Sequence, residues 1–98
     1  MSYRLQELAL LTKADLTPIE RLVLVALAYF ADDEAGLAKP GVDGIAQTIH
    51  CNEKSVRRAL KALESKQLIE CIERGRGRGK VSAWRILAVS DADKGGRL

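Results

Sequence analysis

The chain has 98 residues, of which 47% are hydrophobic and 30% charged, and its formal net charge is +3. This length and composition predict one globular domain with a single modest core, and they exclude a disordered protein. The sequence shows no signal-peptide pattern and no apolar run long enough to span a membrane, so a cytoplasmic protein is expected.

The positive charge is concentrated in one part of the chain. Residues 52–80 contain nine Lys or Arg against four Glu, whereas the remaining residues contain seven basic against nine acidic side chains. Such an asymmetry directs the positive potential to one side, as a surface that binds a polyanion requires. Cys51, Cys71 and the lone His50 do not have the spacing of a zinc site, so no metal and no cofactor are predicted and both thiols are expected to be reduced.

The first predicted element is a short N-terminal helix between Ser2 and Thr12. Its apolar residues recur at helical spacing: Leu5, Leu8, Ala9 and Leu11. We assign residues 1–15 to this helix and its link, as a segment that either docks on its own domain or dimerises.

A stronger helix is predicted from Pro18 to about Ala31. It begins with a capping box, Thr17-Pro18-Ile19-Glu20, in which Pro occupies the first helical position. Its apolar residues cover nearly the whole circumference, so it must be covered on more than one side. The core of the domain covers one side, and the side around Leu24 and Ala28 needs either the N-terminal segment or a second subunit.

Two short helices follow a turn-rich loop, which runs from Asp32 to Gly41 and contains a candidate short strand at 37–39. The first helix is predicted at Val42–Ile49, and the second occupies about 52–65 after a three-residue turn. The second helix has an apolar arc (Val56, Ala59, Leu60 and Leu63) and an opposite polar arc (Lys54, Arg57, Arg58, Lys61 and Ser65). Asn52 is its predicted N-cap, and Glu53 suits the positive end of the helix dipole. This pair of helices predicts a helix-turn-helix.

The periodicity then changes to that of strands. Leu68–Glu73 and Val81–Leu87 are compatible with two strands, and the glycine- and arginine-rich segment 74–80 joins them as a cationic hairpin tip. Trp84 and Phe30 are expected in the core. Residues 88–98 are expected to form a flexible tail.

Several short motifs resemble one known family. Residues 16–87 are similar to the winged helix-turn-helix domains of bacterial, plasmid and phage DNA-binding proteins, in the pieces Thr17-Pro18 with Glu20, Leu22-Val23-Leu24, Ser55-Val56, Arg58-Ala59-Leu60, Leu63, Leu68-Ile69 and Trp84-Arg85-Ile86. The resemblance implies an α+β fold with a three-helix core and a β-hairpin wing, to which the N-terminal helix is an addition. One departure is His50, which stands where the family's turn usually has Gly, a residue more tolerant of positive φ.

Residue chemistry suggests how such a domain contacts double-stranded DNA. Arg and Lys on a helix in the major groove can donate to guanine O6 and N7, and a carboxylate can accept from cytosine N4. The predicted base readers are Glu53, Lys54, Arg57 and Arg58. The predicted phosphate contacts on the same helix are Asn52, Ser55 and Lys61. The basic wing residues are Arg74, Arg76, Arg78 and Lys80, which would follow the backbone or enter a narrow minor groove.

The sequence therefore predicts sequence-specific duplex-DNA binding, either as a small transcriptional regulator or as the origin-binding domain of a plasmid or phage replication initiator. The alternative is a winged-helix module that contacts proteins, such as a phage-encoded inhibitor or assembly factor. The basic residues on the polar arc of the second helix favour DNA over this alternative. No enzyme activity and no small-molecule ligand are predicted. A homodimer through Ser2–Leu11 and a monomer whose N-terminal helix folds back are nearly balanced for the free protein, and a dimer is slightly favoured because one small helix reads few bases.

Overall fold

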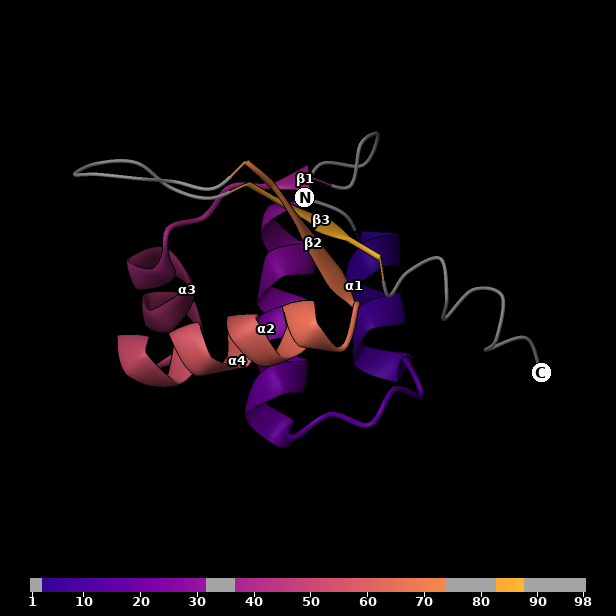
Figure 1. Cartoon of the computed structure of the whole chain (residues 1–98), viewed down its shortest axis with the longest axis horizontal. Helices are drawn as coiled ribbons and strands as arrows, with labels where there is room; N and C mark the ends of the chain where they lie inside the picture. Colours follow the sequence, from indigo (N-terminus) through magenta and orange to yellow (C-terminus); the bar gives the residue numbers. More distant parts are fainter. Residues whose placement is uncertain (1–2, 32–36, 74–82, 88–98) are drawn as a thin grey trace.

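The computed structural model describes residues 3–31, 37–73 and 83–87. Its elements in chain order are α1 (Tyr3–Leu11), α2 (Pro18–Phe30), β1 (Leu37–Ala38), α3 (Val42–Ile49), α4 (Glu53–Ser65), β2 (Ile69–Glu73) and β3 (Ala83–Ile86). Figure 1 shows α2 at the centre of the helices, with the small sheet along one side. The predicted α+β fold of the winged helix-turn-helix type is confirmed.

Helix α2 begins where its capping box predicts. The Thr17 hydroxyl accepts from the backbone N–H of Glu20 at 3.2 Å, and the Glu20 carboxylate accepts from the N–H of Thr17 at 3.1 Å. These two bonds satisfy N–H groups that the first helical turn leaves without partners. The helix ends at Phe30, one residue before the predicted end. It contacts α1, α3, α4, β1 and β3, and it is therefore the element on which the domain is assembled.

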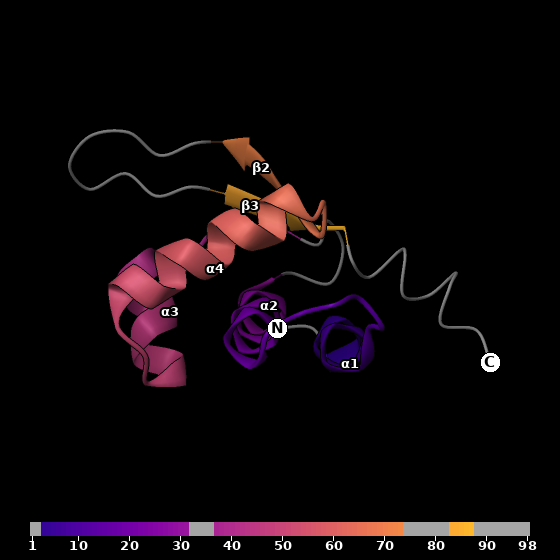
Figure 2. The same cartoon turned by 60° about the horizontal axis from the view of Figure 1, so that its bottom comes forward.

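A single core contains side chains of all four helices and of the sheet. Figure 2 shows how these elements are arranged. The largest fully buried side chains are Val23, Leu24, Leu27, Ile45, Val56, Leu63 and Ile69. The predicted apolar arc of α4 is buried throughout, with every residue at 5% exposure or less. Burial of this arc turns the opposite, charged side of α4 toward solvent, which is the consequence that matters for function.

The sheet has the strand order β1-β3-β2, and both pairings are antiparallel. Leu37 pairs with Arg85, and Ile69 pairs with Ile86. Trp84 and Ile86 are buried while Arg85 between them is exposed, which is the alternation expected of a strand with one face on the core. The register shifts between Cys71 and Glu73, just before the described part of β2 ends. The predicted strands are confirmed, and the predicted tip at 74–80 lies outside the described residues.

Helix α1 packs against α2 of its own chain (Figure 2). Leu5 and Ala9 are buried, and the Arg21 guanidinium donates to the carbonyl oxygens of Leu10 and Thr12, each at 2.9 Å. Arg21 also reaches the carbonyls of Ala9 and Ala14 at 3.4 Å. It therefore caps the C-terminal end of α1, where carbonyls lack helical partners and a cation is favourable. Leu24 and Ala28 of α2 are fully buried. The side of α2 that carries them is therefore covered by other parts of the same chain and does not need a second subunit.

A second cationic side chain connects the end of α4 to the start of α2. Lys66, directly after α4, donates from Nζ to the Asp15 carbonyl and to Glu20 Oε1, each at 2.7 Å. The hydrogen bond from Lys66 lowers the pKa of Glu20 below its ordinary value of 4.5; the hydrogen bonds with Thr17 act in the same direction, against the opposing effect of burial. The Glu20 side chain is only 13% exposed, so solvent screens this contact less than it screens a surface ion pair.

The lowered pKa predicts a pH-dependent contribution of Glu20 to stability. A group whose pKa is lower in the folded state stabilises the fold at pH values above its unfolded pKa, and this contribution is lost as the pH falls through the folded pKa. We therefore expect Glu20→Gln to lower the stability at pH 7 and to have a smaller effect at pH 3. Urea unfolding of both proteins at the two pH values measures this difference.

The control is the same substitution in a Lys66→Met background. Because Lys66 is the main cause of the lowered pKa, Glu20→Gln should then change stability less at pH 7. An equal loss at both pH values would show that the carboxylate charge does not contribute and that only the shape of the side chain matters.

Candidate nucleic-acid interface

The turn between α3 and α4 sets the direction of the second helix. His50 adopts a left-handed conformation with φ 59° and ψ 44°, and the N–H of Cys51 donates to the Ala46 carbonyl at 3.0 Å. This closes α3 with the left-handed conformation that glycine usually adopts after a helix, so His50 takes the positive φ that the turn requires. For a non-glycine residue this conformation costs about 1–2 kcal/mol. The turn is accordingly held by tertiary packing rather than by the preference of its own residue.

The first turn of α4 is fixed by the predicted N-cap. Asn52 Oδ1 accepts from the backbone N–H of Ser55 at 2.7 Å, and Asn52 itself has an extended backbone. Ser55 is half-buried and Asn52 is exposed. The cap thus holds the beginning of the helix, where a helix in a DNA groove would lie deepest, in one defined position.

Four exposed basic residues follow along the outer side of α4. We call these residues the cationic arc: Lys54, Arg57, Arg58 and Lys61. They lie on the side opposite to the buried Val56, Leu60 and Leu63. In the part of the chain that the structure describes, Lys54, Arg58 and Lys61 have no acidic partner. Their charges are available for a polyanion.

Arg57 differs from the other members of the cationic arc because it is paired. Its Nη2 donates to Glu53 Oε1 at 3.1 Å, across one turn of the helix. The side chains of Arg57 and Glu53 are 63% and 49% exposed, so the pair lies in solvent and adds little to stability. The Arg57–Glu53 pair is therefore a feature of the binding surface, and it does not hold the core together.

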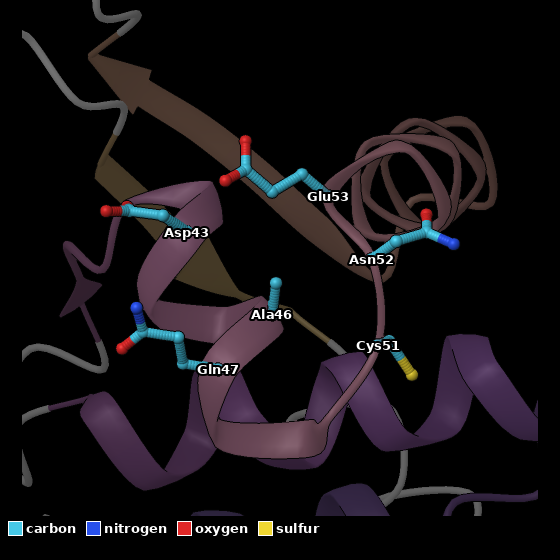
Figure 3. A pocket seen from close by; sticks show the side chains of 6 residues that line it. All are labelled: Asp43, Ala46, Gln47, Cys51, Asn52 and Glu53. Carbon is cyan, nitrogen blue, oxygen red and sulfur yellow. The ribbon is translucent and has the colours of Figure 1, made fainter.

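An open hollow of about 350 Å³ lies beside the start of α4. It is lined by Asp43, Ala46 and Gln47 of α3, by Cys51 and Asn52 of the turn, and by Glu53 (Figure 3). Asp43 and Glu53 approach its rim from the two different helices. Neither Asp43 nor Gln47 was predicted as a site residue, because their place beside α4 follows from the angle between the helices and not from any motif.

The predicted site residues divide into two groups. Those on α4 or at its cap belong to a single helix and its N-cap, and all of them except the half-buried Ser55 are exposed: Asn52, Glu53, Lys54, Ser55, Arg57, Arg58 and Lys61. The predicted wing residues, Arg74, Arg76, Arg78 and Lys80, lie outside the described residues. Within the described ranges, no three His, Cys, Asp or Glu side chains are arranged to hold a metal ion. None of the helices in those ranges is both long and apolar enough to cross a membrane.

Residues 14–69 match a protein family described as a helix-turn-helix domain. The chain belongs to this family. The match runs from the link before α2 to the first residue of β2, so it includes α2, α3, the turn and the whole of α4. Membership in the helix-turn-helix family indicates DNA as the partner, in agreement with the exposed cationic arc. No curated protein and no solved structure matches the chain.

Proposed function

We propose that this helix-turn-helix protein binds duplex DNA sequence-specifically by placing α4 in the major groove, as a small transcriptional regulator or as a plasmid or phage origin-binding domain. The observation that carries the proposal is the cationic arc on the outer side of a helix whose inner side is fully packed. A helix of this kind fits the major groove, and its position is set by the core and by the Asn52 cap rather than by flexible segments.

Within this proposal, the exposed residues of α4 have two kinds of role. Arg57, Arg58 and Lys54 donate to guanine O6 and N7, and Glu53 can accept from cytosine N4. Asn52, Ser55 and Lys61 contact phosphates and fix the register of the helix on the duplex.

The wing completes the proposed interface. Arg74, Arg76, Arg78 and Lys80 would follow the DNA backbone, and each phosphate contact would contribute about 0.9 to the slope of log affinity against log salt.

Selection of bound duplexes from a random pool tests the function directly. We expect one enriched motif that contains guanine, since arginine is the main candidate for base contacts. Binding without an enriched motif would contradict sequence specificity. Absence of any binding at low salt would contradict the function and would favour the alternative, a helix-turn-helix module that contacts other proteins.

We further propose that the protein forms a homodimer through the outer side of α1 and α2. Of the seven exposed large hydrophobic residues in the described ranges, six lie on these helices: Tyr3, Leu10, Leu11, Leu22, Tyr29 and Phe30. Phe30 was expected in the core, but it is 38% exposed. Its ring packs edge-on against the ring of Tyr29, with 5.1 Å between the ring centroids. Large apolar side chains exposed on two neighbouring helices favour a surface that binds another protein, and a second copy would double the number of bases read.

Light scattering of the free protein and of its complex with DNA tests the assembly. We expect Leu22→Glu to lower the mass of the bound species to that of one copy. Ile72→Glu is the matched control, because Ile72 has the same 43% exposure as Leu22 but lies on β2. A wild-type mass of one copy, both free and on a single site, would contradict the dimer.

A further inference from the structure

The start of α4 carries an acidic side chain, Glu53, whose negative charge opposes the attraction between this helix and DNA. Glu53 is exposed beside the cationic arc, and Asp43 adds a second carboxylate at the rim of the same hollow. Each of these charges repels phosphate. Glu53 does suit the helix dipole, but Asn52 already caps this end of the helix. The contact that distinguishes Glu53 from an ordinary first-turn acid is its hydrogen bond with Arg57.

The chemistry of the guanidinium makes this contact informative. Arginine has five N–H donors in a rigid plane, and the Glu53 carboxylate occupies one of the two terminal nitrogens of Arg57. Donors remain on the rest of the group, which is enough for the two acceptors that guanine presents. Pairing also offsets the positive charge of Arg57, so its attraction to phosphate, which depends on net charge, falls. Its directional hydrogen bonds to a base remain.

We propose that Glu53, instead of reading a cytosine itself, is a positioning residue that holds Arg57 for a guanine and away from the phosphates, so that the two residues set specificity as one unit. This inference rests on the proposed function. The other members of the cationic arc supply the general attraction, since Lys54, Arg58 and Lys61 have no acidic partner in the described part of the chain. Glu53 thereby separates base reading from backbone attraction on a single helix.

The test compares affinity for the selected duplex with affinity for a duplex in which the guanine pairs are exchanged. The ratio of the two affinities should fall about tenfold in Glu53→Gln, with no loss of affinity for the exchanged duplex, because the released arginine can turn to a phosphate. Glu70→Gln is the matched control. It removes the same charge from an ion pair of similar exposure, that of Glu70 with Arg85 at 3.7 Å on the sheet, and it should leave the ratio unchanged.

Glu53→Asp separates positioning from charge. The variant keeps the negative charge at the helix start, but its side chain is shorter by one methylene and should hold Arg57 poorly. The ratio of the affinities for the selected and the exchanged duplex should therefore fall as it does in Glu53→Gln. A wild-type ratio in either variant overturns the inference. In an Arg57→Ala background, Glu53→Gln should cause no further change, and a full tenfold loss there would show that Glu53 acts on a base independently, which also overturns it.

The wild-type protein separates failure of this inference from failure of the proposed function. If the wild type prefers the selected duplex and the Glu53 variants prefer it equally, only the positioning role is overturned. If the wild type does not distinguish the two duplexes, the proposed function is overturned and this inference falls with it. Thermal unfolding of each variant confirms that the comparison is made between folded proteins.

Discussion

Replacing Arg57 and Arg58 together by Ala should weaken binding to the selected duplex by about 1–3 kcal/mol for each arginine that makes a bidentate contact with guanine. This corresponds to about a five- to 150-fold rise in Kd per contact. Both side chains are exposed on the outer side of α4. The substitution therefore removes hydrogen-bond donors from the surface that is proposed to enter the major groove, and it does not disturb the core. Titration of the selected duplex with the double variant measures the effect.

Two controls make the arginine result interpretable. Arg85→Ala removes an exposed arginine from β3 instead of α4, and it should change affinity much less. The unfolding midpoint of the double variant should remain close to that of the wild type, because substitutions at exposed positions usually change stability by less than about 0.5 kcal/mol. Wild-type affinity of the double variant would rule out α4 as the recognition helix.

The second large effect is expected in the core. Leu63 is fully buried on the inner side of α4, which packs on α2, and Leu63→Ala should lower the free energy of unfolding by about 2–5 kcal/mol. The cost has two sources, the lost burial of the side chain and the cavity that remains. Urea unfolding measures it through the shift of the midpoint at constant slope.

Lys61→Ala on the same helix is the matched comparison. Lys61 is exposed on the opposite side of α4, so its truncation should leave stability nearly unchanged while weakening DNA binding. Together the two variants separate the inner, stabilising side of α4 from its outer, binding side. A loss below about 1 kcal/mol for Leu63→Ala would mean that the surrounding helices close the cavity by moving together.

Local signals in the sequence determined the helices and the separation of the two sides of α4. The capping box at Thr17–Glu20 and the N-cap at Asn52 act over three residues, and the structure contains both hydrogen-bond sets. The period of apolar residues in α4 predicted which side would be buried, because a helix repeats its geometry every few residues. These features depend only on neighbouring residues, and for that reason they were predicted to within about one residue.

Only the tertiary structure decided how these helices are joined. Lys66 reaches Glu20 across 46 positions of the sequence, and Arg21 reaches back to the end of α1 across 9 to 12 positions, without a periodic signal for either contact. The hollow between Asp43 and Glu53 likewise depends on the angle at which α3 meets α4. The exposure of Phe30 could not be read from its hydrophobicity, because an apolar residue at a helix end is buried only if another element reaches it. Sequence alone determined the repeating local structure and the charged side of α4, whereas packing between distant segments decided how the helices are joined and which apolar side chains are covered.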